Sequence, residues 1–290
     1  MKKLKLFLLV LIFLLVFGFI FKNEILDFYS DFTLKLPEVE KEISQFLTPE
    51  IEKEVSLPEP IEAKKEYPQA VLTQEGIIKW TNIQREKYGL PPLKESLKLD
   101  ASSVIKVEDM FENQYFDHYS PSGQGVGDLA KIVNYEFILI GENLAMGNFK
   151  DDENLVNAWM ESPGHRENIL NPKYQEIGVA VKKGIFKGKE TWIAVQHFGL
   201  PLSACPQPDE KLKVKIDENE KEIDQLLEEI KILEIEIKKM RPKWGSEYER
   251  KIDEYNSLVL KYNSLIKETQ SLIDRYNLQV KSFNQCIKEK

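Results

Sequence analysis

The chain has 290 residues, of which 42% are hydrophobic and 30% charged, and its formal net charge is −8. This length admits one or two ordinary domains, and the hydrophobic fraction is sufficient for a buried core. The acidic balance argues against nucleic acid as a partner, because neutralising phosphates requires clustered cationic side chains.

Residues 1–22 are expected to form a single-pass transmembrane signal anchor. The uncharged run 6–21 would span about 24 Å as a helix, and flanking lysines can extend it by reaching to the membrane interface. Lys2, Lys3 and Lys5 favour a cytoplasmic N-terminus, which places the bulk of the chain outside the cell membrane. The alternative is a cleaved signal peptide and a secreted protein, although no A-x-A-like cleavage site follows the run.

Residues 23–68 are predicted to be an acidic, proline-containing stalk. Residues 22–68 contain six lysines and twelve acidic residues, and five prolines interrupt any long helix. This composition is typical of a semi-extended spacer.

Residues 69–203 have a globular composition. Apolar residues at helical spacing predict helices over 71–89, ending at Gly89, and over 97–113, with shorter helical pieces within 156–170. Two strand-like runs, 177–186 and 190–199, are joined by Lys-Gly-Lys. Helices followed by a terminal hairpin indicate an α+β layered domain with antiparallel strands.

Residues 204–290 are predicted to form an antiparallel coiled-coil hairpin that turns near residue 243. Apolar residues alternate at spacings of three and four through two segments, 216–240 and 252–283, which Pro242 and Gly245 separate. Folding about this turn places Asn219, which interrupts the apolar seam, near Thr269.

The same fold brings the two cysteines together. Residue 286 falls opposite residue 201 or 202, about one helical turn from Cys205. We therefore predict a Cys205–Cys286 disulfide, which agrees with an oxidising, extracytoplasmic location. The alternative is two unpaired thiols.

Several motifs in the globular part resemble, in order, the bacterial branch of the CAP superfamily of cysteine-rich secretory, antigen 5 and pathogenesis-related proteins. They are TNIQREKYGLPPL, F-x-H-x-S-P-x-G, G-E-N-L-A, W-M-x-S-P-G-H-R-x-N-I-L and a strand pair ending Q-x-F-G. The resemblance covers about 130 residues, and implies an α-β-α sandwich with a cleft. In that cleft His118, Glu142 and His165 would converge.

Three further residues are candidates for the cleft. Larger members of the family carry a glutamate three positions after the tryptophan of the third motif; here Ser162 occupies that position and Glu161 comes one residue earlier. Ser162 followed by Pro163 also fits a helix N-cap, with His165 in the first turn. His197 is either a third imidazole of the cleft or a surface residue.

Three function classes remain open. The first class is a binding module. Two imidazoles and a carboxylate are ligand types of Zn²⁺, so His118 and His165 could hold a divalent metal in it. Alternatively, the module binds a small polar ligand or a lipid. An adaptor would present the coiled-coil hairpin to a cell-envelope protein or polysaccharide. A hydrolase ranks third, because neither G-x-S-x-G nor H-E-x-x-H occurs and no catalytic residue can be assigned.

Overall fold

The computed structural model describes residues 20–22, 24, 47–51 and 53–290. The predicted signal anchor lies almost wholly outside these residues. In the part that is described, no helix is both long and apolar enough to span a membrane.

The chain divides into two units. The globular unit comprises Pro49–Gln207 together with Lys281–Lys290, and the helical unit contains Pro208–Val280. Residues 49–68 therefore belong to the globular unit, and the expected stalk of residues 23–68 does not extend through them. The last ten residues also belong to the globular unit, although the final helix continues through them to Glu289.

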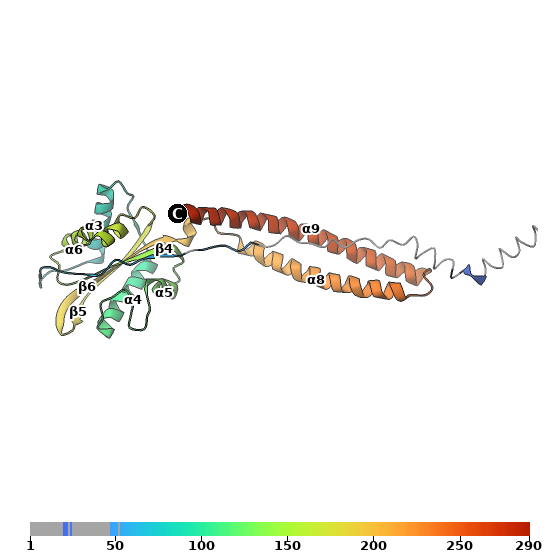
Figure 1. Cartoon of the computed structure of the whole chain (residues 1–290), viewed down its shortest axis with the longest axis horizontal. Helices are drawn as coiled ribbons and strands as arrows, with labels where there is room; N and C mark the ends of the chain where they lie inside the picture. The colour runs from blue at the N-terminus through green and yellow to red at the C-terminus, as the bar shows by residue number, and fades with distance from the viewer. Residues whose placement is uncertain (1–19, 23, 25–46, 52) are drawn as a thin grey trace, which may run out of the picture. The chain divides into compact units, whose positions relative to one another are not determined.

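The helices and strands of the globular unit have the following bounds (Figure 1): β1 Glu54–Ser56, β2 Ile61–Glu62, α3 Gln74–Lys87, β3 Lys94–Glu95, α4 Leu97–Asn113, α5 Val126–Ile132, β4 Phe137–Met146, α6 Asp152–Glu161, α7 Pro163–Ile169, β5 Glu176–Phe186, β6 Lys189–Pro201 and the 3₁₀ turn η1 Leu202–Ala204. The expected helices 71–89 and 97–113 correspond to α3 and α4. A left-handed Gly89, with φ of 72°, follows the end of α3 as predicted.

The strands form one mixed sheet in the order β1-β4-β6-β5-β3, and β2 also pairs with β4. The expected hairpin is β5–β6, and β4 adds to it antiparallel, whereas β1, β2 and β3 pair in parallel. The sheet is therefore mixed rather than purely antiparallel. The strand β4, which contains G-E-N-L-A, was not predicted.

The sheet lies between two helical layers, so the unit is an α-β-α sandwich (Figure 1). Alternate strand residues point to opposite faces: Ile177 and Val179 pack in the core cluster with α3 and α6, whereas Ala180, Ile193 and Val195 pack against α4. A β-carbon at Gly178 would lie 2.1 Å from the main-chain carbon of Leu99, so this glycine permits α4 to pack directly on β5.

The predicted disulfide is confirmed: Cys205 and Cys286 are bonded. Cys286 and Ile287, from the end of α9, pack against the same core cluster as Phe198 and Trp159. The last turns of α9 are thereby fixed to the sandwich covalently and by apolar contact.

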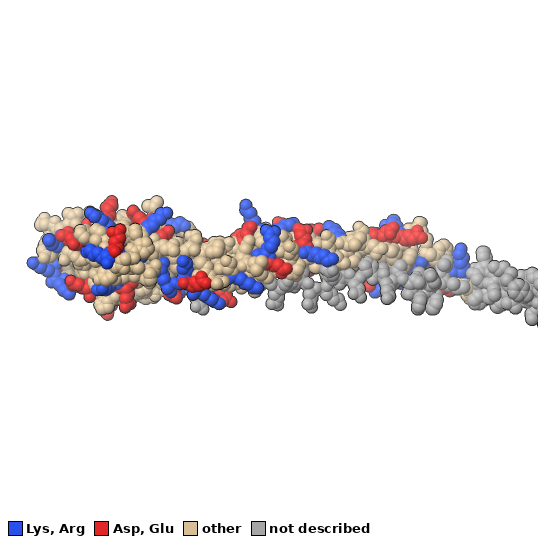
Figure 2. All heavy atoms as spheres, turned by 90° about the horizontal axis from the view of Figure 1, so that it is seen from above, with Lys and Arg blue, Asp and Glu red and all other residues tan. Residues whose placement is uncertain are grey.

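The helical unit consists of α8, Glu210–Lys239, and most of α9, Ser246–Glu289. The buried positions of α8 are the predicted seam residues, and they share apolar clusters with α9. Asn219 donates to the Thr269 hydroxyl at 3.1 Å, as predicted, and the Glu236–Lys251 pair closer to the turn fixes the antiparallel direction. On the face seen in Figure 2, acidic and basic side chains are interspersed rather than segregated.

Candidate functional site

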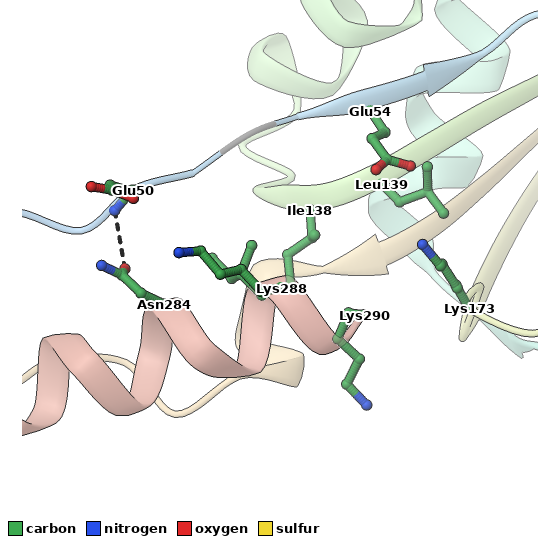
Figure 3. Close-up of a pocket in the computed structure, with 9 residues that line it drawn as sticks. Glu50, Glu54, Ile138, Leu139, Lys173, Asn284, Lys288 and Lys290 are labelled. Atoms are coloured by element: carbon green, nitrogen blue, oxygen red, sulfur yellow. Dashed lines mark hydrogen bonds between the residues drawn. The ribbon is translucent and has the colours of Figure 1, made fainter.

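Two grooves of the globular unit contain none of the candidate histidines. One, of about 260 Å³, is lined by residues of both charges, among them Glu54, Lys173 and Lys290 (Figure 3). The other, of about 350 Å³, lies beside α6 and is lined by Glu161 and Ser162. The three histidines are instead buried, so the histidine motifs meet at a closed site.

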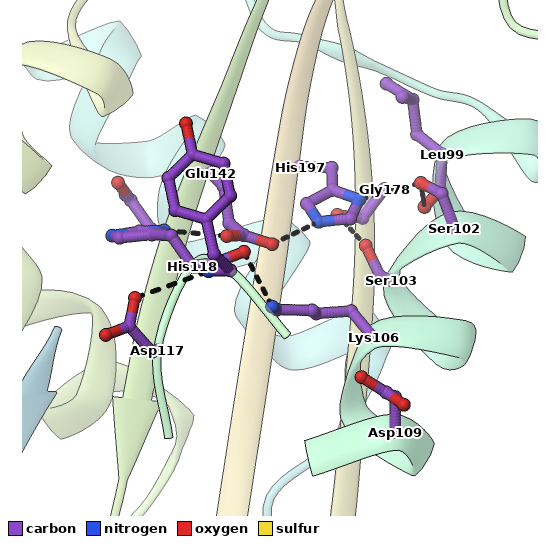
Figure 4. Close-up of polar contacts among 12 residues, drawn as sticks. Leu99, Ser102, Ser103, Lys106, Asp109, Asp117, His118, Glu142, Gly178 and His197 are labelled. Carbon is purple, nitrogen blue, oxygen red and sulfur yellow. Dashed lines mark hydrogen bonds and ion pairs between the residues drawn. The ribbon is translucent and has the colours of Figure 1, made fainter. Parts of the chain in front are cut away.

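That closed site is centred on the carboxylate of Glu142 in β4. His197 is the residue opposite Glu142 on β6, and its Nε2 lies 2.8 Å from Oε2. His118, from the loop between α4 and α5, places Nδ1 2.6 Å from Oε1 (Figure 4). Glu142 and His197 are completely buried and His118 is 6% exposed. His197 is thus the third imidazole of the site, not a surface residue.

Glu142 is held in its ionised form. Burial alone would raise its pKa, but hydrogen bonds from His118 and His197, together with the charges of His197 and Lys106, outweigh burial and lower the pKa to about 2. The arrangement is a buried carboxylate with an imidazole at each oxygen and the Lys106 ammonium group nearby.

Lys106 supplies a further buried cation. Its ammonium group donates to the carbonyl oxygen of His118 at 2.7 Å (Figure 4). It also donates to the Tyr115 hydroxyl at 3.2 Å. Burial lowers the pKa of Lys106, and the nearby carboxylates of Glu142, Asp109 and Asp117 act against that effect. Lys106 therefore fixes the loop that carries His118.

The contacts of His118 define its protonation. Nε2 lies 2.5 Å from the carbonyl oxygen of Pro58, which can only accept a hydrogen bond, and Nδ1 faces the ionised Glu142 carboxylate. Both partners are acceptors, so making both hydrogen bonds takes an N–H at each ring nitrogen of His118. His197 differs, because its Nδ1 meets the Ser102 hydroxyl at 2.7 Å, a group that can donate or accept.

His165 lies close to this cluster but is not hydrogen-bonded to it. It is completely buried, its Nδ1 lies 2.8 Å from the Ser162 hydroxyl, and its Nε2 has no hydrogen-bond partner. Burial and the charge of His118 lower the pKa of His165 to about 4, against a weaker effect of the Leu144 carbonyl. His165 is therefore neutral near pH 7.

Ser162 and His165 do not form an effective nucleophile and base. A general base works best with a pKa near the operating pH and needs a third group to orient it. His165 is too weakly basic, and its free Nε2 has no carboxylate beside it. Ser162 is the N-cap residue of α7, as predicted, with Pro163 at the first helical position, but its hydroxyl binds His165 instead of a backbone N–H.

Glu161 does not join the cluster. It lies on an exposed face at the end of α6, where it pairs with Lys64 at 3.6 Å. It thus does not replace the glutamate that larger family members carry one position later.

The donor set does not fit a resident metal ion in this conformation. A metal ligand must offer a free, unprotonated nitrogen, whereas both ring nitrogens of His118 face acceptor oxygens and both oxygens of Glu142 face imidazole nitrogens. Within the described residues, no three His, Cys, Asp or Glu side chains form a group that could hold a metal.

A neutral hydrogen-bond network supports the cluster. The Asn143 amide donates to the His165 carbonyl and to the Gln196 side chain, Gln196 donates to Thr81, and Asn168 donates to Asn143. We did not single out these amides, Ser102 or Lys106 from the sequence. The amides lie inside the quoted motifs, which could have identified them. Lys106 is seven residues after buried Leu99 on the same helix face, and this spacing could have indicated that it is buried.

The comparison with known families agrees with these motifs. Residues 79–198 match the model of the CAP family, described as the cysteine-rich secretory protein family. Residues 79–198 therefore correspond to a CAP domain.

Two curated proteins of Bacillus subtilis (strain 168) are similar to parts of the chain. The uncharacterized protein YkwD is 43% identical over 103 residues, which cover 36% of this chain and 40% of YkwD. The uncharacterized membrane protein YlbC is 33% identical over 111 residues, which cover 38% of this chain and 32% of YlbC. The chain thus spans less than half of either relative.

Among solved structures, an extracellular protein containing an SCP domain from Bacillus anthracis has 30% identity and a TM-score of 0.38, covering 43% of this chain and 39% of that one. An outer surface protein of Borrelia burgdorferi has 24% identity and a TM-score of 0.39, covering 44% of this chain and 91% of that one.

Replacing Glu142 by glutamine keeps the size of the side chain but removes the anion that compensates His118 and Lys106. We expect the free energy of unfolding to fall by about 3–5 kcal/mol, because buried cations lose their partner. Urea denaturation measures this change. The matched control is Glu161→Gln at the exposed glutamate, which should cost less than about 1 kcal/mol; equal losses in the two variants would contradict the assignment.

Acid should destabilise the protein in two steps with distinct origins. The pKa of His165 is lowered from 6.5 to about 4, so the unfolded chain binds more protons and stability falls as the pH drops through this window, by up to about 3 kcal/mol. The pKa of Glu142 is lowered from 4.5 to about 2, so its contribution is lost between these two values.

The variant His165→Asn should remove the upper step and retain the lower one. Urea midpoints measured for both proteins across this pH range separate the two contributions. An unchanged upper step in the variant would show that another group causes it.

Proposed function

We propose that this protein is a membrane-anchored, extracytoplasmic binding protein whose CAP domain holds a ligand at the His118–Glu142 cluster without turning it over. The observation that carries the proposal is the 2.5 Å contact between Nε2 of His118 and the carbonyl oxygen of Pro58, an acceptor outside the buried cluster. A buried, charge-compensated imidazolium is a fixed donor, suited to a carbonyl or anionic oxygen of a ligand.

Binding without catalysis is favoured by the state of the candidate reactive groups. A hydrolase needs a nucleophile beside a base of suitable pKa. Ser162 contacts only a weakly basic imidazole, and the Ser120 hydroxyl is engaged with Ser122 and the Gln124 backbone. The donor chemistry of His118 favours an organic ligand, polar or lipid, over a divalent metal.

The extracytoplasmic location rests on independent features. The Cys205–Cys286 bond requires an oxidising compartment in most organisms. The uncharged run 6–21 with its preceding lysines supplies the proposed anchor. One relative, YlbC, is itself described as a membrane protein.

The second candidate is an envelope adaptor that uses the helical hairpin. Its support is the length of α8 and α9 and the disulfide that ties the end of α9 to the CAP domain. The exposed faces of the hairpin carry ion pairs within the unit, such as Lys261 with Glu222, which is typical of a solvated surface. The binding site is therefore the better-supported function.

Two measurements on the full-length protein in bacterial cells test the proposal. After removal of the cell wall, added protease should digest the CAP domain while the protein fractionates with membranes. A fluorophosphonate probe, which labels activated serines, should leave Ser162 unmodified. Recovery in the cytosol would contradict the location, and labelling of Ser162 that His165→Asn abolishes would replace the binding protein by a hydrolase.

A further inference from the structure

The partner of His118 is part of an extended segment, residues 53–63, which we call the strap. Its first half, β1, pairs with β4 in parallel, with Val55 opposite Ile140, and its second half, β2, does so with Ile61 opposite Ala145. Between these two pieces the chain passes Glu142, Asn143 and Leu144 without strand pairing. Pro58 lies in this interval.

The strap contacts the family motifs at three points. His118 donates to the Pro58 carbonyl at 2.5 Å, and the Asn168 amide donates to the Ser56 carbonyl at 3.5 Å. A β-carbon at Gly164 would lie 2.7 Å from the β-carbon of Pro58, so the absence of a side chain there admits the proline ring. Two of the three contacts reach main-chain carbonyls, which any extended peptide offers.

The strap is bound without being part of the core. None of residues 53–63 is fully buried, and only Leu57, Ile61 and Ala63 pack against apolar clusters. Local opening costs least where few apolar contacts must break. The strap can therefore leave β4 while the sandwich persists.

We propose that the CAP cleft is a docking groove for an extended, proline-containing peptide, and that the strap is its intramolecular occupant. This inference rests on the proposed binding function and names the class of ligand. The groove combines the edge of β4, which the strap occupies, with the His118 imidazole for the carbonyl of the proline and Gly164 as the floor beneath its ring. A peptide from a partner binds when it displaces the strap.

The strap also sets how readily the groove opens. A tethered segment competes at an effective concentration in the millimolar range, so a free peptide binds the intact chain weakly. Weakening the strap without changing the groove should therefore raise the affinity for added peptide.

The test uses the full-length chain and a fluorescein-labelled peptide with the strap sequence KEVSLPEPIEA, followed by fluorescence anisotropy. The strap variant combines Leu57→Asp, which removes an apolar contact, with Pro58→Gly. We expect this variant to bind the peptide at least about tenfold more tightly than the unaltered chain does. A folded strap variant that does not bind overturns the proposal.

Gly164→Ala supplies a matched groove control. Added to the strap variant, it should weaken peptide binding by about tenfold, because the new methyl group meets the proline ring. A peptide with glycine in place of the proline that corresponds to Pro58 should bind this variant without the loss of affinity, since it has no ring to collide with the methyl group. Loss for both peptides, or for neither, contradicts docking at this groove.

A second measurement serves if the strap variant fails to fold. In the otherwise unaltered chain, Gly164→Ala alone should speed hydrogen exchange at the β1 amides that pair with β4 but not in β6, and adding Pro58→Gly should restore protection. Unchanged exchange in Gly164→Ala overturns the proposal. The protease and serine-labelling experiments that test the proposed function do not involve the strap. A negative result here would therefore contradict the peptide groove but not the broader binding function.

Discussion

The structure depends on one buried charge, the Glu142 carboxylate. It has no contact with solvent, and it remains ionised because imidazoles from a neighbouring strand and from a loop donate to its two oxygens. This requirement explains why β4 and β6 pair in the register that places Glu142 opposite His197. It also explains why Lys106 is buried: its ammonium group fixes the backbone of His118 and adds positive charge near the carboxylate.

The same charge decides what the site can do. An ionised Glu142 makes His118 a donor at both ring nitrogens, one directed inward and one toward the strap. A doubly protonated imidazole neither ligates a metal nor acts as a base, but it binds an oxygen acceptor firmly. His165, the other histidine of the motifs, is neutral and weakly basic for the complementary reason that burial and the charge of His118 oppose its protonation. The proposed binding role rests on the contacts of these two histidines.

Local patterns predicted much of the fold. The α4 helix, the β5–β6 hairpin, the coiled-coil seam, the Asn219–Thr269 contact and the Cys205–Cys286 bond all depend on periodicity or on residues brought together by one turn. Strand β4 was missed because Glu142 and Asn143 interrupt its apolar run, and their burial is possible only through partners on other elements. The strap was interpreted as a spacer because its prolines and charges are typical of one, and its pairing is supplied by the edge of β4.

Of the candidate residues named from the motif resemblance, His118 and Glu142 are in contact, and His165 lies beside them without a hydrogen bond to either. The sequence left His197 open, and it placed Glu161 near a site that it does not join. Protonation depends on the partner of each ring nitrogen, and the decisive partner, the Pro58 carbonyl, belongs to a segment sixty residues earlier in the chain. No motif records such a contact.

The central claim is that His118 is an imidazolium held between Glu142 and Pro58, and its ring nitrogens report this directly. Long-range ¹H–¹⁵N correlation NMR on the full-length protein with ¹⁵N-labelled histidine, near neutral pH, distinguishes protonated from bare nitrogens. The account predicts two protonated nitrogens in His118 and one bare nitrogen in His165. A bare nitrogen in His118 would contradict it, since either Glu142 or the Pro58 carbonyl would then lack its donor.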